Sequence, residues 1–143
     1  MSHTYTSIRL YTDGGARGNP GPAGAGAVLK TIQEDGTDGD IIGTVSRYLG
    51  ETTNNQAEYY ALIFALEKAK DLGAKTVDAI LDSELIVKQL QGTYKVKHPE
   101  IMKRFLEVQH LLRQFDSVSF RHVLRAKNKE ADRLVNEAID KRL

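Results

Sequence analysis

The chain has 143 residues, a length that predicts one folded domain with its own hydrophobic core. It contains no cysteine, which excludes disulfides and thiolate metal sites, and it shows no leader segment and no run of about 18 apolar residues, so we expect a cytoplasmic protein without membrane contact. The formal net charge is +1, but residues 1–85 carry 7 basic and 12 acidic side chains, whereas residues 86–143 carry 13 basic and 7 acidic ones, a segregation compatible with metal binding and phosphate contact.

The first third of the chain alternates between apolar and polar residues, as β-strands do. This alternation predicts strands over residues 8–13, 25–32 and 41–49. A turn rich in glycine and proline at 14–22 and an acidic loop at 33–40 separate them. Three consecutive strands with short connections predict an antiparallel meander.

After the third strand, the apolar residues take helical spacing. The pattern predicts, in order, a helix over 57–72 that ends at Gly73, a strand over 77–81, helices over 83–90 and 98–115, a strand over 118–124 and a helix over 128–139. A helical crossover between strands implies parallel pairing. We therefore predict an α/β fold in one domain over residues 1–143: a five-stranded mixed sheet, three strands antiparallel and then two parallel, flanked by helices.

Four carboxylates stand near the ends of these predicted elements. Asp13 closes the first strand and Asp82 the fourth, while Glu58 and Asp132 lie in the first turns of two helices. Carboxylates that converge repel one another, so a cluster of them indicates a bound cation, and an all-oxygen ligand set indicates Mg²⁺ or Mn²⁺. Two such ions about 3.5–4 Å apart can act on the attacking water and the leaving oxygen of a phosphodiester.

Each carboxylate also has a structural interpretation. Asp13 can form a turn, and residues 55–58 read as a capping box with Asn55 as the cap. Asp82 can act near the N-terminus of the helix that follows it, and Asp132 can favour the positive end of a helix capped by Asn128. Spacing alone does not decide between a metal site and separate structural roles.

The longest motifs of the chain resemble those of type 1 ribonucleases H. Residues 11–15 read YTDGG, and GNPGP follows at 18–22, as in the opening motif of that family. Residues 52–58 read TTNNQAE and resemble its second motif. LDS at 81–83 and NKEADRL at 128–134 match the third and fourth. The four motifs occur in the family's order over nearly the whole chain.

This resemblance implies a ribonuclease H-like fold and an endonuclease that cuts the RNA strand of RNA/DNA hybrids, leaving 3′-hydroxyl and 5′-phosphate ends. It implies two Mg²⁺ ions, which Mn²⁺ could replace, held by Asp13, Glu58, Asp82 and Asp132 as the catalytic and metal-binding residues. No protein partner is implied, and we expect a monomer.

The resemblance also implies which residues contact the hybrid. A pocket for a DNA phosphate maps onto Thr53, and contacts with 2′-hydroxyls and base edges map onto Gly14, Asn19, Asn54, Asn55 and Gln56. Amide side chains suit this task because the 2′-hydroxyl is both a donor and an acceptor, and an amide offers both complements.

Two features depart from many members of the family. The loop before the last aspartate reads RAKNKE at 125–130 and lacks the family's histidine. Arg125 lies nearest to that place and is either a phosphate contact or a solvated surface residue, while His122 falls inside the strand pattern and is interpreted as structural. The second departure is the absence of a long basic "handle" segment between the middle helices.

Two other functions would also fit a domain of this kind. The first is a module that binds hybrids without cutting them, and the presence of all four carboxylates argues against it. The second is a nuclease of the same fold that acts on DNA, and the asparagine-rich second motif argues against that.

Overall fold

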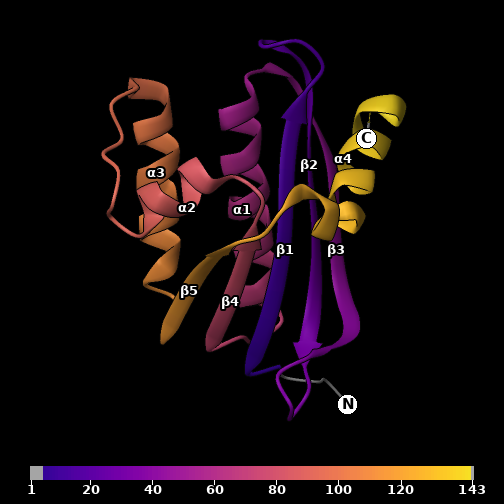
Figure 1. Cartoon of the computed structure of the whole chain (residues 1–143), viewed down its shortest axis with the longest axis vertical. Helices are drawn as coiled ribbons and strands as arrows, with labels where there is room; N and C mark the ends of the chain where they lie inside the picture. The colour runs from indigo at the N-terminus through magenta and orange to yellow at the C-terminus, as the bar shows by residue number, and fades with distance from the viewer. Residues whose placement is uncertain (1–4, 143) are drawn as a thin grey trace.

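A computed structural model describes residues 5–142 and contains one five-stranded sheet. Strands β1 (Ser7–Ala16), β2 (Gly21–Ile32) and β3 (Asp38–Thr52) pair antiparallel. Strand β4 (Thr76–Leu81) pairs parallel with β1, and β5 (Ser117–His122) pairs parallel with β4. The order is β3-β2-β1-β4-β5, which confirms the predicted mixed sheet (Figure 1).

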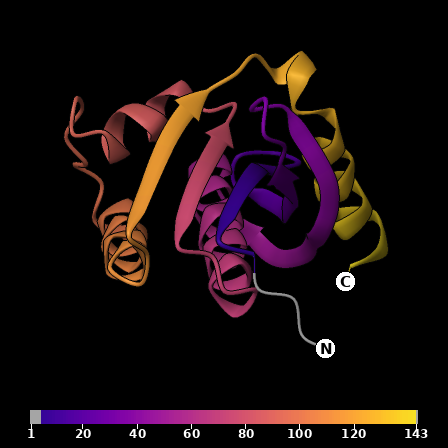
Figure 2. The same ribbon diagram turned by 90° about the horizontal axis from the view of Figure 1, so that it is seen from below.

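Helices lie on both faces of this sheet (Figures 1 and 2). On one face, α1 (Asn54–Asp71) packs against β1 and β2, with α3 (Pro99–Leu112) beside it. On the other face, α4 (Lys129–Lys141) packs against β2 and β3. The short α2 (Glu84–Leu90) follows β4, and a 3₁₀ turn, η1 (Arg125–Lys127), precedes α4. Within residues 5–142, no helix is long and apolar enough to cross a membrane.

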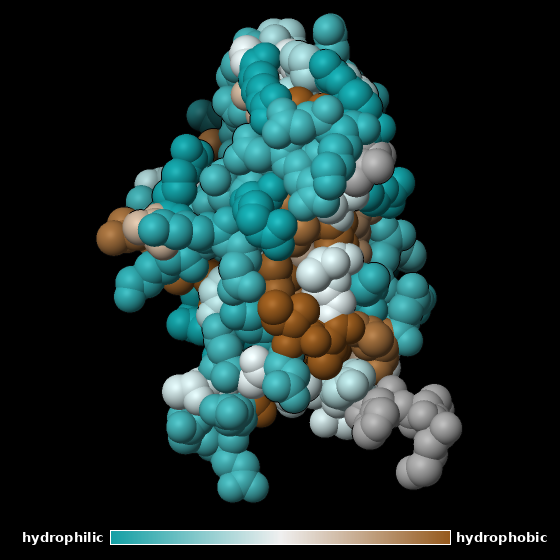
Figure 3. All heavy atoms as spheres, turned by 90° about the vertical axis from the view of Figure 1, so that its right-hand side faces the viewer, coloured by the Kyte–Doolittle hydropathy of each residue, from teal (hydrophilic) through white to brown (hydrophobic). Residues whose placement is uncertain are grey.

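The main core lies between the sheet and α1. Because side chains alternate along a strand, Ile8 and Leu10 of β1 share one face, and both are fully buried in one cluster with Leu62 and Leu66 of α1. On the opposite face, α4 buries one apolar side made of Ala131, Leu134, Val135, Ala138 and Ile139. The surface over α4 and β3 is mostly hydrophilic, with one compact hydrophobic area (Figure 3).

The prediction of a turn over residues 14–22 is wrong for most of that segment. Strand β1 continues to Ala16 and β2 begins at Gly21, so the connection spans only residues 17–20. The glycines allow close packing inside the sheet: a Cβ on Gly14 would lie 2.2 Å from the Ala57 carbonyl oxygen of α1. The sequence pattern predicted a turn here because glycine is typical both of turns and of places where two backbone segments lie close together.

The other predicted elements are confirmed with shifted ends. Strand β3 runs over 38–52 where 41–49 was predicted, and α1 begins at Asn54, three residues before the predicted start. Strand β5 ends at His122, and Leu124, predicted as its last residue, is 70% exposed.

Gly26 offers a test of the packing between β2 and α4. A Cβ there would lie 2.4 Å from the Ala131 carbonyl oxygen and 2.9 Å from the Val135 nitrogen, so we expect Gly26→Ala to lower the free energy of unfolding by about 1–3 kcal/mol. Urea denaturation measures this change. Gly15→Ala is the matched control, because its nearest contact would be Val135 Cγ1 at 3.8 Å. An equal loss in both variants would contradict the packing argument.

Candidate active site

Asp13 lies inside β1, not at the strand end that the sequence predicted. The parallel pairing of β1 with β4 ends at the pair Thr12 and Leu81. Asp13 follows Thr12 within β1, and Asp82 follows Leu81 immediately after β4. Asp13 is directly opposite Gly26 of β2, on the face that carries α4, and only 6% of it is exposed. The end of β4 therefore places Asp82 beside a buried carboxylate.

The other two carboxylates come from helices on opposite faces of the sheet. Glu58 reaches the site because Gly14 has no side chain, which lets the backbone of α1 at Ala57 and Glu58 lie against β1. Asp132 lies in the first turn of α4, where its backbone N–H donates to the Asn128 carbonyl oxygen at 3.1 Å. The structure thus brings the four predicted carboxylates together from four different elements or element ends.

Two carboxyls of this cluster, those of Asp13 and Glu58, have raised pKa values. Burial raises the pKa of Asp13 to about 8, and the carboxylates of Asp82, Asp132 and Glu58 raise it as well. Burial likewise raises the pKa of Glu58 to about 7, although the Ser83 hydroxyl and the charge of Arg125 act in the opposite direction and lower it. Asp13 and Glu58 therefore favour their protonated forms near neutral pH when no cation is bound.

An open cleft of about 340 Å³ gives access to the site. Asp13, Glu58 and Asp132 line it together with Arg125, while Asp82 is not part of its wall. Within residues 5–142, no group of three or more His, Asp or Glu side chains is placed so that it could hold a metal ion. The carboxylates act on one another electrostatically, since Asp82, Asp132 and Glu58 all affect Asp13.

The residues predicted to contact the hybrid gather where the 17–20 turn meets α1. Asn54 Oδ1 accepts a hydrogen bond from the Ala16 N–H at 2.8 Å, and the Asn54 N–H donates to Asn19 Oδ1 at 3.0 Å. Asn55 is exposed at the start of α1. Asn54 and Asn19 therefore join the turn to the helix, whereas Asn55 faces solvent.

The capping interpretation of this region needs correction. Thr53, not Asn55, caps α1, because its side chain accepts from the Gln56 N–H at 3.3 Å. The Oε1 atom of Gln56 is buried and has no hydrogen-bond partner among the described residues. Asn128 stands at the cap position of α4 but makes no capping bond with its side chain. The sequence could not distinguish these asparagines, because the same residue type caps helices and bridges strands.

Separate substitutions should divide the two roles of this region. We expect Asn54→Ala to weaken hybrid binding and to lower the free energy of unfolding by about 1 kcal/mol, because the side chain no longer accepts the hydrogen bond from the Ala16 N–H, while the backbone bond to Asn19 is kept. Asn55→Ala should weaken hybrid binding alone. Binding in Ca²⁺ and thermal unfolding measure the two effects. If neither variant changed the preference for hybrid over duplex DNA, these residues would not belong to the recognition surface.

His122 is the last residue of β5. It is paired with Leu81 and exposed. Arg125 follows in η1, is exposed and lines the cleft, so the structure places this arginine by the carboxylates as the sequence suggested. The interpretation of His122 as structural is not tested by this arrangement.

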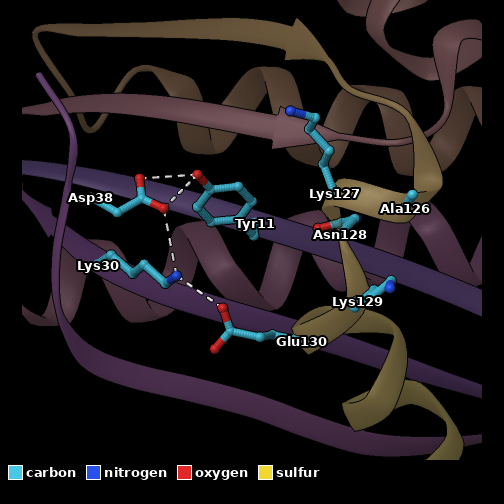
Figure 4. A pocket seen from close by; sticks show the side chains of 8 residues that line it. All are labelled: Tyr11, Lys30, Asp38, Ala126, Lys127, Asn128, Lys129 and Glu130. Atoms are coloured by element: carbon cyan, nitrogen blue, oxygen red, sulfur yellow. Dashed lines mark hydrogen bonds and ion pairs between the residues drawn. The ribbon is translucent and has the colours of Figure 1, made fainter.

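A second, smaller pocket of about 180 Å³ lies on the other side of η1 (Figure 4). Four of its side chains form one network: the Tyr11 hydroxyl donates to both oxygens of Asp38, at 2.9 and 2.7 Å, and Lys30 pairs with Asp38 and Glu130. Asn128 forms part of its wall. None of the four clustered carboxylates lines this pocket.

The fold and the acidic cleft define a class of protein: a ribonuclease H-like α/β protein with four clustered carboxylates. Over residues 11–138, the chain matches the protein family described as reverse transcriptase-like. Over 133 residues it is 44% identical to the bifunctional protein Rv2228c of Mycobacterium tuberculosis and equally to a ribonuclease HI of Halobacterium salinarum. Each alignment covers 93% of this chain.

Solved structures agree with these relatives. The RNase H1 of Halobacterium salinarum has a TM-score of 0.87 at 43% identity, covering 94% of this chain and 98% of that one. LC11-RNase H1, isolated from compost and solved in complex with an RNA/DNA hybrid, has a TM-score of 0.85 at 50% identity, covering 94% and 97%. The chain belongs to the type 1 ribonuclease H family. It spans 35% of the length of Rv2228c and 64% of the Halobacterium protein.

Proposed function

We propose that this protein is an endonuclease that hydrolyses the RNA strand of RNA/DNA hybrids. The observation that carries the proposal is its likeness to LC11-RNase H1, a protein solved with such a hybrid, over 94% of this chain. The four carboxylates beside the cleft supply the chemistry that hydrolysis needs. A cytoplasmic location and a monomeric state stay predictions.

The donor set fits two Mg²⁺ ions, or Mn²⁺ as a substitute. The ligands would be Asp13, Glu58, Asp82 and Asp132. Burial and the neighbouring carboxylates together raise the pKa of Asp13, and a bound cation would offset both effects. Mg²⁺ keeps several water ligands and shares phosphate oxygens with its substrate, so few protein ligands suffice for it. When bound, the ions would supply the Lewis acidity that activates water and stabilises the leaving oxygen.

The chain's own residues would place the substrate in this site. Asn54, Asn55 and Gln56 lie in the first turn of α1 and would read the minor groove and the 2′-hydroxyl, while Glu58 follows one turn later at the cleft. The Arg125 guanidinium stays charged and would hold a phosphate by charge-assisted hydrogen bonds. Hydrolysis would leave a 3′-hydroxyl and a 5′-phosphate.

Cleavage of a hybrid with a labelled RNA strand tests the proposal. We expect cleavage within the RNA strand in Mg²⁺, none in excess chelator, and none of duplex DNA. Extension of the products by a 3′-hydroxyl-dependent polymerase tests the ends. A folded protein that binds the hybrid and leaves it intact in both Mg²⁺ and Mn²⁺ would instead be a binding module.

Arg125 should contribute to cleavage although it cannot act as a base. Since hydrogen bonds to charged groups are worth about 1.5–3 kcal/mol and an exposed group is partly screened by salt, we expect Arg125→Ala to lower kcat/KM about tenfold. Lys127→Ala removes a charge from the same turn outside the cleft and is the matched control.

His122→Ala should retain near-normal single-turnover rates in the same assay. A severe loss in a folded His122→Ala variant, with Arg125→Ala unaffected, would reverse the assignment and make His122 the catalytic group of this loop.

A further inference from the structure

Asn128 connects the elements that carry three of the four carboxylates. Its Nδ2 donates to the Thr12 carbonyl oxygen at 2.8 Å and to Asp82 Oδ2 at 3.1 Å. Its backbone carbonyl oxygen accepts from the Asp132 N–H at 3.1 Å. Thr12 is the residue before Asp13, so this one residue contacts β1, the end of β4 and the first turn of α4.

Asn128 is buried, and its surroundings determine how its side-chain amide is oriented. Only 2% of the residue is exposed, although both of its chain neighbours are exposed. The two partners of its amide, a carbonyl and a carboxylate, are both acceptors, so only the NH₂ end can face them. The orientation of the amide is therefore determined by its surroundings, and both of its hydrogens are used.

A role in stability alone does not account for this arrangement. Residues at the start of a helix usually stabilise it by accepting a hydrogen bond from its first turn, and the Asn128 side chain makes no such bond. Its Oδ1 atom is buried without a partner among the described residues, which costs free energy. Asparagine at this position thus gives up part of its stabilising capacity in order to hold Asp82.

We propose that Asn128 is a positioning residue of the carboxylate cluster. By joining the Asp82 carboxylate to the end of the β1–β4 pairing, its amide sets where that carboxylate stands relative to Asp13. By starting α4 at the same point, its backbone sets the position of Asp132. The inference rests on the proposed function, in which these carboxylates hold the divalent ions.

Substitution of Asn128 tests this role. Asn128→Ala removes both donated hydrogen bonds, and Asn128→Asp keeps the shape of the side chain but turns its donor end into a second carboxylate facing Asp82. Groups that orient metal ligands typically affect metal affinity or turnover by about 10- to 100-fold, and we expect a loss of that size in kcat for both variants, with KM for the hybrid changed less than about threefold. Calorimetric titration of the hybrid-free protein with Mn²⁺ should show weakened binding in parallel.

The matched control is Gln89→Ala. Gln89 is also a buried amide, 8% exposed, and it accepts one hydrogen bond, from the Tyr59 hydroxyl at 2.7 Å, so its side chain bonds to a phenol and not to a carboxylate of the cluster. It should lose stability in thermal unfolding while keeping kcat and Mn²⁺ affinity. If the Asn128 variants behaved like Gln89→Ala, with stability lowered and both readouts unchanged, Asn128 would be a purely structural residue.

The design separates this inference from the proposed function. If the unsubstituted protein cleaved no hybrid, the proposed function would fail, and Mn²⁺ binding alone would decide the role of Asn128. If Asn128→Ala did not fold, kcat and Mn²⁺ affinity would both be measured on Asn128→Asp. Cleavage by the unsubstituted protein together with unchanged Mn²⁺ affinity and kcat in Asn128→Asp would overturn the inference and leave the function intact.

Discussion

Asp13→Asn is expected to abolish hybrid cleavage while the fold persists. Asp13 is buried at the centre of the cluster, and burial together with three neighbouring carboxylates already disfavours its charge. The amide keeps the volume of the side chain but removes a negative ligand. A loss of about 4 kcal/mol in transition-state stabilisation corresponds to a rate roughly 1000-fold lower, and we expect a loss of at least that size in single-turnover cleavage.

The control for this variant is Asp71→Asn, which neutralises an exposed carboxylate at the far end of α1. Its cleavage rate should stay within about twofold of the unsubstituted protein, as expected for a surface position. Near-normal turnover by a folded Asp13→Asn variant in Mg²⁺ would remove Asp13 from the catalytic residues and weaken the assignment of the other three.

The sequence predicted the order of the elements well, because hydrophobic periodicity distinguishes strands from helices in each segment. It misjudged residues 14–22, where glycine normally indicates a turn. In the folded chain, Gly14 is a strand residue beneath α1, and its missing side chain permits helix–sheet contact. Such a use of glycine depends on which helix lies above the strand, and local sequence carries no information about that.

The sequence predicted which residues form the candidate site, but not the hydrogen bonds that join the elements around it. The motifs singled out Asp13, Glu58, Asp82 and Asp132, and the fold brings all four together, while their catalytic roles stay predictions. The hydrogen bonds from Asn128 to Thr12 and Asp82 span 116 and 46 residues of sequence. Periodicity and capping rules are local, so they assigned Asn128 to its own helix and could not find this bridge.

The ion-free protein should lose stability as the pH rises from about 5 to 8. The pKa of Asp13 is raised from 3.8 to about 8 and that of Glu58 from 4.5 to about 7. In this window the unfolded chain ionises these carboxyls while the folded protein retains protons, so the unfolded state gains stability with increasing pH. One retained proton changes the free energy of unfolding by about 1.4 kcal/mol per pH unit. The raised pKa values therefore predict a decline that ends above about pH 8.

Asp13→Asn isolates this effect, because an amide does not titrate. The stability of the unsubstituted protein minus that of the variant, measured by urea unfolding in chelator, should fall steadily between pH 5 and 8. Carboxyls with lowered pKa values, such as Asp38 and Asp78, titrate below this window and do not obscure the difference. Mg²⁺ binds the ionised cluster, so it should raise the unfolding temperature more at pH 8 than at pH 6, and less in the variant. A difference that stayed constant with pH would mean that Asp13 is ionised throughout and that neither burial nor its carboxylate neighbours raise its pKa.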